Sequence, residues 1–410
     1  MTETLEPRAV VQQETPGDYF RRWWTGVRAG DLGSLPIIIG LIVIMSVFGT
    51  LNPLFFSARN FVNLLLQMAG FATMAIGIIF ILLIAEIDLA VAYVSAVGGV
   101  VMTLLLRESG PAWPWYAAMG VALLTTTLIG LLHGLIITKA GVPSFVVTLA
   151  GLLAWSGVVL ILTTVFSTSG AIVIQNPVVL GVANSYLPPE WGWGVFAIAI
   201  GGFSLNQWVQ RQALLRQNLP VKPLAVTALQ VLGLVLIVGL AVWYANQDRG
   251  VPMVSVIILI LLIIWSIIAS RTRFGRYVYA VGGNPEAARR AGINVDQVRI
   301  LVFMISGFMA GMGGIILASR LRSIDTNSGG GNLLLNVIAS AVIGGTSLFG
   351  GHGRVTNALI GALVIASVEN GMGLLLLPSG VKFVVTGLVL LAAVLIDAFS
   401  RRSRVASGIA

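Results

Sequence analysis

The sequence predicts an all-α membrane protein whose chain crosses the bilayer many times. Hydrophobic residues make up 57% of the 410 residues and charged residues only 10%, and the mean hydropathy is +0.96. Soluble domains are about 25% charged, so this chain cannot cover its surface with polar groups and needs lipid around it. Its apolar residues are grouped in runs of about 20, the length that a helix needs to cross the hydrocarbon core.

Twelve apolar runs are candidate membrane-spanning helices, and segments containing proline or glycine separate them. They lie at about 35–55, 61–84, 88–106, 115–138, 145–166, 191–208, 224–245, 251–269, 300–318, 333–349, 356–376 and 382–397. The run at 333–349 is short and rich in glycine, and it fits either a full span or a broken, re-entrant helix. We therefore expect about 12 spans, within a range of 10–12.

The distribution of lysine and arginine predicts that both ends of the chain are cytoplasmic. With the N-terminus inside, eighteen of the 24 Lys and Arg residues fall on the inside and six on the outside, as the positive-inside rule requires. This asymmetry explains the net charge of +9 without a nucleic-acid partner. The chain has no cysteine, which excludes disulfides and Cys-ligated metals. Its first residues lack the apolar segment of a signal peptide, so we expect no cleavage there.

We expect three regions along the chain: a cytoplasmic N-terminal segment at 1–34, a transmembrane domain at 35–397 and a cytoplasmic tail at 398–410. Three short segments recur in the same order within the transmembrane domain. Ser95–Gly99 resembles Ser340–Gly345, His133-Gly134 resembles Asn370-Gly371, and Phe145–Thr148 matches Phe383–Thr386.

Each of these pairs lies on spans that the predicted topology orients in opposite directions. The sequence therefore predicts two inverted repeats, an architecture that many transporters use for alternating access. Chance similarity in a chain rich in Gly, Ala and Val is the alternative. If the repeats are real, the stretch at about 170–250, with two spans and a long outer loop, is an insertion between them.

The longest predicted inside loop, 271–299, contains the signals for one short helix. Asn284 can cap the start of this helix, and Pro285 suits its first position. Gly292 can adopt the left-handed conformation that ends it.

Charges in the same segment have the signs that the two ends of a helix dipole favour: Glu286 lies near the start, and Arg289 and Arg290 lie near the end. A helix of two turns is not stable alone in water, so it needs a surface to dock on. A solvated loop retained for its positive charge is the alternative. We favour a helix presented to a cytoplasmic partner.

Residues 272–293, which include this helix, resemble the coupling loop of the permeases of ATP-binding-cassette sugar importers. Residues 341–351 are similarly typical of that family, and Ile87-Asp88-Leu89 is typical in weaker form. The resemblance covers about 60–400 and is specific to the ribose/xylose branch. The extra spans near 190–250 make the chain most similar to the xylose-type members.

The resemblance implies a type II importer fold in a bacterial inner membrane. In that family two permeases pair with two cytoplasmic ATPases and a periplasmic sugar-binding protein. It therefore implies a homodimer that imports a monosaccharide, D-xylose or another pentose. It also implies that one segment docks into a cleft on the ATPase, with the residues Asn284, Pro285, Glu286, Ala287, Ala288, Arg289, Arg290, Ala291, Gly292 and Ile293.

The chain itself has the features of a non-enzyme with no cofactor. None of its three lysines lies in a phosphate-binding GxxxxGK[ST] loop, so we expect ATP hydrolysis on a separate chain. No group of His, Asp and Glu has metal-ligand spacing, and no GxSxG motif is present. His133 is expected to form a hydrogen bond between helices, and His352 lies in a glycine-rich inner loop.

Five polar residues within or beside the spans are candidates for the substrate path: Asp88, Glu86, Asn336, Glu369 and Asn370. A carboxylate at the bilayer centre costs about 2.5–3.5 kcal/mol, so Glu86 or Asp88 is expected to reach water or a cavity. The alternative for these two is that they mark the cytoplasmic turn between spans. Asparagine can also pair helices with each other, which is the alternative for Asn336 and Asn370.

Two departures from the family pattern leave the transported sugar open. Family members commonly carry Gly-Ile-Asp-Leu-Ser-Val-Gly, whereas this chain has Glu86 and Ala92 at the two glycine positions and Ala90 at the serine. His133 stands where the family often has asparagine.

Two other classes of transporter remain as alternatives. The first is an ion-coupled secondary transporter, which would need no ATPase and would use Asp88 or Glu369 for protons. The second is a branched-chain amino acid permease of the same superfamily. ATP-dependent uptake of a panel of sugars distinguishes all three. Two glycine pairs, Gly130/Gly134 and Gly307/Gly311, are expected to permit close helix packing and no more.

Overall fold

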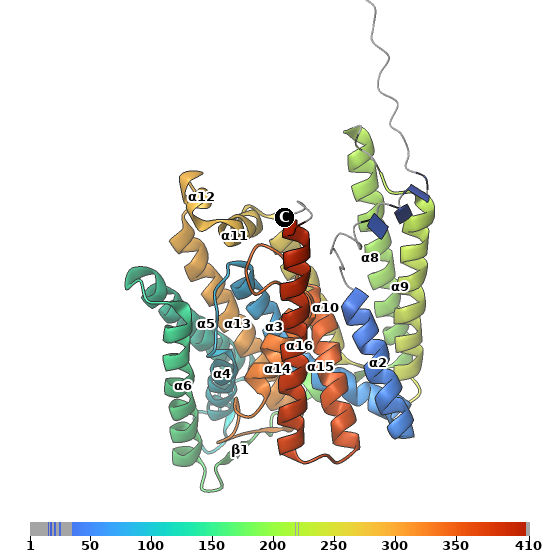
Figure 1. Cartoon of the computed structure of the whole chain (residues 1–410). Helices are drawn as coiled ribbons and strands as arrows, with labels where there is room; N and C mark the ends of the chain where they lie inside the picture. Colours follow the sequence, from blue (N-terminus) through green and yellow to red (C-terminus); the bar gives the residue numbers. More distant parts are fainter. Residues whose placement is uncertain are drawn as a thin grey trace, which may run out of the picture. The chain divides into compact units, whose positions relative to one another are not determined.

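The computed structural model describes residues 15, 17, 18, 20, 21, 24, 25, 35–217, 219 and 221–406. The predicted N-terminal segment, 1–34, lies largely outside these described residues, as does the end of the predicted tail, 407–410. Within them the structure is almost entirely helical (Figure 1). The prediction of an all-α polytopic protein is confirmed.

The chain forms two compact units, and the smaller one contains Leu187–Val251. In it, α8 (Pro189–Arg216) and α9 (Leu224–Ala245) pack against each other as a hairpin. Arg211 Nη1 donates a hydrogen bond of 2.6 Å to the carbonyl oxygen of Lys222, which ties α8 to the connection before α9. This unit overlaps the stretch at about 170–250 that the sequence suggests as an insertion.

The larger unit contains Ser34–Tyr186 and Pro252–Phe399. Its long helices before the insertion are α2 (Leu35–Leu51), α3 (Ala58–Leu83), α4 (Val91–Leu106), α5 (Trp115–Lys139) and α6 (Ser144–Phe166), with the 3-10 turn η1 (Pro53–Phe56) after α2. After the insertion follow α10 (Met253–Arg271), α11 (Arg273–Gly283), α12 (Pro285–Arg290), α13 (Val295–Leu321), α14 (Leu333–Ile343), α15 (Asn357–Leu374) and α16 (Ser379–Ala406). Helix α16 therefore continues past 397, where the sequence analysis placed the end of the last span.

Short elements lie between the helices of this unit. Strand β1 (Ala171–Val173) pairs antiparallel with β4 (Ser323–Asp325), so that Ile172 is opposite Ile324. A short helix, α7 (Pro177–Asn184), follows β1, and Asn176 caps it. Strands β2 (Tyr186–Leu187) and β3 (Val251–Pro252) lie where the chain passes from one unit to the other.

Seven described helices are long and apolar enough to cross a membrane: α3, α5, α6, α9, α10, α13 and α15. Shorter apolar stretches lie in α2, α4, α14 and α16. A described helix overlaps each of the twelve predicted spans, but α14 has only 11 residues. It rises about 16 Å, roughly half of the hydrocarbon thickness, so the run at 333–349 forms a half-length helix followed by a turn.

Two helices, α3 and α13, form the centre of the larger unit. Most of α3 is buried, and it packs against α13, α14 and α15, while α13 packs against α3, α4 and α5. The predicted repeat segments lie on α4 and α14, on α5 and α15, and on α6 and α16. Each central helix thus packs on helices that carry the repeat segments of the other half.

The two glycine pairs lie on facing helices, α5 and α13. A Cβ atom at Gly130 would overlap the carbonyl group of Phe303, and one at Gly307 would overlap the carbonyl group of Thr126. Their expected role in close helix packing is confirmed.

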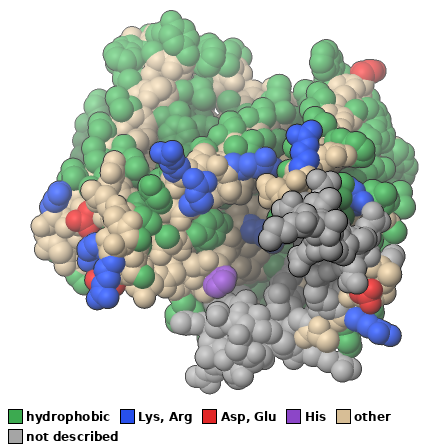
Figure 2. All heavy atoms as spheres, turned by 90° about the horizontal axis from the view of Figure 1, so that it is seen from above, with side chains coloured by type: hydrophobic (Ala, Val, Ile, Leu, Met, Phe, Trp, Pro, Cys, Tyr) green, Lys and Arg blue, Asp and Glu red, His purple; other side chains and the backbone are tan. Residues whose placement is uncertain are grey.

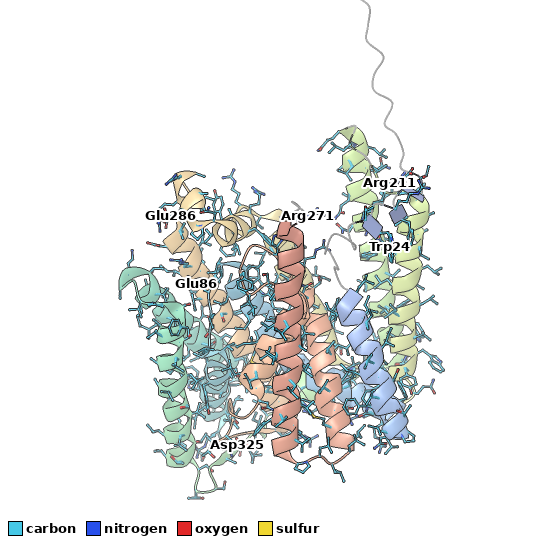
Figure 3. The ribbon with its side chains drawn as sticks, in the orientation of Figure 1. Trp24, Glu86, Arg211, Arg271, Glu286 and Asp325 are labelled. Carbon is cyan, nitrogen blue, oxygen red and sulfur yellow. The ribbon has the colours of Figure 1, made fainter. Side chains whose placement is uncertain are left out.

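The larger unit has two ends that can be named by their elements (Figure 1). The loop-helix end holds α11 and α12, and the strand end holds β1 and β4. Figure 3 shows Glu286 and Arg271 at the loop-helix end and Asp325 at the strand end. Figure 2, seen from the side of the loop-helix end, shows several blue Lys and Arg side chains at the surface.

Candidate functional site

Helix α12 begins and ends where its capping signals predict. Asn284 Oδ1 accepts a hydrogen bond of 3.0 Å from the backbone N–H of Ala287, and Pro285 occupies the first helical position. At the other end Gly292 has φ +82°, and the N–H of Ile293 donates to the carbonyl oxygen of Ala288 at 3.0 Å. The prediction of a short capped helix between Asn284 and Gly292 is confirmed.

Most residues of α12 are exposed to solvent, but one of its two central alanines is buried. Glu286, Ala287, Arg289 and Arg290 are exposed, and Arg289 Nη1 lies 3.0 Å from Glu286 Oε1. Ala288 is only 4% exposed, because it packs inside this chain. Of the two central alanines, Ala287 is thus the one that a partner can contact.

A second helix in the same loop, α11, was missed in the sequence. Thr272 caps it, since Thr272 Oγ1 accepts a hydrogen bond of 3.1 Å from the N–H of Gly275. Phe274, Val278 and Val281 are spaced as on one helix face, and both valines are fully buried. The capping residue and this spacing are the two signals in the sequence that could have identified the helix.

Helix α11 is fastened to the end of α3 and to a glycine-rich loop. Tyr279 Oη donates a hydrogen bond of 2.8 Å to the carbonyl oxygen of Gly353. The N–H of Gly351 donates to the carbonyl oxygen of Leu83 at 3.0 Å, and a Cβ at Gly282 would overlap that same carbonyl. Burial raises the pKa of the Tyr279 phenol, although the Arg354 guanidinium opposes this shift, so the phenol stays a donor.

Glu86 and Asp88 lie in the turn between α3 and α4. Asp88 is 6% exposed; its Oδ2 accepts from Ser306 Oγ at 2.7 Å and its Oδ1 accepts from the N–H of Ala90 at 2.9 Å. Glu86 Oε1 lies 3.0 Å from Arg299 Nε, an ion pair without hydrogen-bond alignment. Because Arg299 and Ser306 are two turns apart on α13, both carboxylates hold the turn to one face of that helix.

Helix α6 contacts the other side of this turn. The N–H of Ile87 donates to Ser144 Oγ at 3.2 Å, and the carbonyl oxygen of Ile87 accepts from Thr148 Oγ1 at 3.3 Å. Thr148 belongs to the repeat segment 145–148, which thus has a structural role in the first half of the chain.

The other three candidate path residues lie near the strand end. Asn336 Nδ2 on α14 donates a hydrogen bond of 2.6 Å to Glu369 Oε1 on α15. Asn336 is 2% exposed, and its Oδ1 has no hydrogen-bond partner among the described residues. A buried amide oxygen without a donor and a carboxylate beside it form a group that can accept hydrogen bonds from hydroxyls.

Asn370 pairs two helices with each other. It exchanges hydrogen bonds of 2.8 and 2.9 Å with Asn60 on α3, and its Nδ2 also donates to Gln67 Oε1 at 3.3 Å. The structure therefore separates the candidate path residues into two groups, near opposite ends of α3. The distance along that helix from Asn60 to Leu83 is about 35 Å.

Two basic residues lie on helices of the larger unit: Arg320 on α13 and Lys382 on α16. Both side chains are only partly exposed.

The two histidines have different surroundings. His133 is 4% exposed, and its Nε2 accepts a hydrogen bond of 3.1 Å from Trp155 Nε1, which joins α5 to α6 as expected for a bond between helices. His352 is exposed in the glycine-rich loop. In the described part of the chain, no three His, Asp or Glu residues are grouped so that they could hold a metal ion.

These features define the class: a polytopic helical membrane protein with a structured loop at one end and buried polar groups between its helices. A family profile described as "Branched-chain amino acid transport system / permease component" matches residues 60–394. The chain belongs to this permease family.

Curated relatives match over almost their whole length. The xylose transport system permease protein of Escherichia coli (strain K12) is 38% identical over 386 residues, which cover 92% of this chain and 95% of that protein. The xylose transport system permease protein of Haemophilus influenzae is 36% identical over 89% of this chain and 96% of its own length. The ribose import permease protein of Escherichia coli (strain K12) is 32% identical over 92% of this chain and 96% of its own length. No solved structure matches the chain.

Proposed function

We propose that this chain is the membrane-spanning subunit of an ATP-driven importer for a monosaccharide, D-xylose or another pentose. The observation that carries the proposal is α12, a capped helix whose outer face is exposed and whose inner face packs on the chain itself. The similarity to xylose and ribose permeases over about nine-tenths of the chain supports the sugar class. In this account the chain is not an enzyme and uses no cofactor.

In this proposal the loop-helix end faces the cytoplasm and α12 inserts into a cleft on a separate ATPase. The segment from Asn284 to Ile293 supplies the contact, chiefly through Ala287 and its exposed neighbours. Movement of α12 passes to α11, and from α11 to the end of α3 and to the glycine-rich loop, because both are hydrogen-bonded at this junction. Two copies of the chain and a periplasmic sugar-binding protein complete the importer.

The strand end then receives the sugar, and Glu369 and Asn336 accept hydrogen bonds from its hydroxyls. Their shared hydrogen bond fixes the carboxylate, and the free Oδ1 of Asn336 supplies a second acceptor. Asn370 holds α15 to α3 beside them. Asp88 and Glu86 act at the other end of the path, where they hold the α3–α4 turn on α13.

Both termini are cytoplasmic in this proposal, in the inner membrane of a bacterium. The charge asymmetry supports this orientation, as eighteen of the 24 basic residues fall on the proposed inner side. Reporter fusions after Arg299 and Arg404 are expected to report cytoplasm, and a fusion after Asp248 to report periplasm. A periplasmic signal after Arg404 would overturn the orientation.

Uptake into vesicles that hold the whole complex tests the function. The importer is expected to take up xylose or another pentose only when ATP is present on the side of the membrane where the ATPase is bound. Uptake of leucine and no sugar would favour the branched-chain amino acid alternative. Sugar uptake that an ion gradient drives without ATP would favour a secondary transporter.

A further inference from the structure

An apolar groove of about 310 Å³ lies on the larger unit between α5, α10, α11 and α13. Helix α13 contributes Leu301, Met304, Ile305 and Phe308 to its lining. These four residues are spaced i, i+3, i+4 and i+7, so they form one continuous face of the helix. The face extends for about 10 Å along α13, starting near the loop-helix end.

The opposite wall of the groove is aromatic and rigidly packed. Trp265 and Phe274 both line the groove and both pack on the buried Phe80 of α3, with ring centroids 5.5 and 6.3 Å from it. This packing fixes the positions of both rings in the wall.

The corner between α10 and α11 closes the groove at the loop-helix end. Thr272 Oγ1 donates a hydrogen bond of 2.6 Å to the carbonyl oxygen of Ile268, which lines the groove, and accepts one of 3.1 Å from the N–H of Gly275. A Cβ at Gly275 would overlap the carbonyl group of Ala269, so the two helices meet without space between them. The corner is therefore a fixed part of the groove.

Three exposed arginines lie at this corner: Arg271, Arg273 and Arg276. Arg271 is one turn from Ile268 on α10, and Arg273 directly precedes Phe274 on α11. An apolar groove that begins beside exposed cations at the membrane surface matches a molecule with an apolar chain and an anionic head.

We propose that the groove and the corner bind one anionic phospholipid. One acyl chain lies along the α13 face, and the phosphate lies against the exposed arginines of the corner. A second copy of the chain is a poorer occupant, because an isologous contact centred on the groove would bring the same arginines of both copies together. The proposal requires only that the chain spans a membrane, whichever way it is oriented.

Native mass spectrometry of the purified full chain tests this binding. Phosphatidylglycerol and phosphatidylcholine with identical acyl chains are titrated separately, and glycerol phosphate is added as a head group without chains. Near a membrane surface, each arginine raises the affinity for an anionic lipid about fivefold. The wild-type chain is expected to prefer phosphatidylglycerol by about tenfold or more, and glycerol phosphate is expected not to displace it.

Two variants with matched controls separate the groove from the head-group contact. Arg273→Gln/Arg276→Gln is expected to reduce phosphatidylglycerol binding to the level of phosphatidylcholine, whereas Arg289→Gln/Arg290→Gln on α12 retains the preference. Ile305→Trp fills the groove and is expected to weaken both lipids, whereas Ile260→Trp, at an exposed apolar position of α10 outside the groove, does not. A melting curve for each variant confirms folding.

Three results would overturn the proposal. The first is equal binding of the two lipids by the wild-type chain. The second is displacement of phosphatidylglycerol by glycerol phosphate, which would make the site a phosphate site alone. The third is a dimer that Ile305→Trp dissociates while lipid binding stays unchanged, which would make the groove an interface between copies.

Discussion

The phenolic oxygen of Tyr279 lies 2.8 Å from the carbonyl oxygen of Gly353 and donates a hydrogen bond to it. This bond links α11, the helix before α12, to the glycine-rich loop that follows α14. The same junction includes the end of α3 through the bond from Gly351 to Leu83. Three segments far apart in the sequence are thus fastened together at α11, the helix that directly precedes α12.

Removing the hydroxyl of Tyr279 is expected to weaken coupling. Tyr279→Phe keeps the ring and removes one hydrogen bond, which costs about 0.5–1.5 kcal/mol. Sugar-stimulated ATP hydrolysis by the assembled complex is expected to fall, while basal hydrolysis and binding of the ATPase stay intact. Tyr277→Phe, on an exposed position of the same helix, is the control. Unchanged stimulation in Tyr279→Phe would remove this bond from the coupling route.

The Asp88–Ser306 bond is expected to stabilise the packing of the α3–α4 turn on α13. A hydrogen bond to a charged group contributes about 1.5–3 kcal/mol, so Asp88→Asn is expected to lower stability and uptake. Glu86→Gln is expected to have a smaller effect, because Glu86 and Arg299 form a partly exposed ion pair. In a double-mutant cycle, Asp88→Asn and Ser306→Ala are expected to show coupling above about 0.5 kcal/mol. Additive effects, or near-normal transport by both carboxylate variants, would contradict this role.

Glu369 is expected to matter for transport more than for folding. Glu369→Gln retains the hydrogen bond from Asn336 but removes the charge that accepts from sugar hydroxyls. Uptake is expected to fall about tenfold or more, as for the loss of one charge-assisted hydrogen bond. Membrane insertion and ATPase binding are expected to be normal. Glu190→Gln, an exposed carboxylate on α8, is the control; equal uptake by the two variants would exclude Glu369 from the path.

Local signals in the sequence predicted most of the helices. The bounds of α9, 224–245, match the predicted run, because prolines and polar residues flank an unbroken apolar segment. The Asn284-Pro285 signal placed the start of α12. The same signal, Asn176-Pro177, marks α7, but it was overlooked within an outer loop. Helix α14 ends early because Gly344 and Gly345 interrupt its apolar run, and Gly345 has φ +99°.

Contacts between distant segments had no signal in a single sequence. The Asn60–Asn370 pair joins residues 310 positions apart, and nothing in the local pattern of either segment predicts its partner. Burial of Ala288 also has no signal in the sequence, because a short alanine-containing helix does not show which of its faces packs on the chain. A charge at Ala288 would therefore disrupt this chain itself, which makes Ala287 the better position for testing a partner.

Co-purification of the ATPase with an Ala287→Glu variant tests the central claim most directly. Ala287 is exposed on α12, so a charged side chain there leaves the permease fold intact but obstructs insertion into a cleft. Ala280→Glu, at an exposed position of α11, is the matched control. If α12 docks on the ATPase, Ala287→Glu inserts normally into the membrane and loses the ATPase, whereas Ala280→Glu retains it. Full co-purification and sugar-stimulated ATP hydrolysis with Ala287→Glu would contradict the account, and α12 would then be a solvated part of the loop.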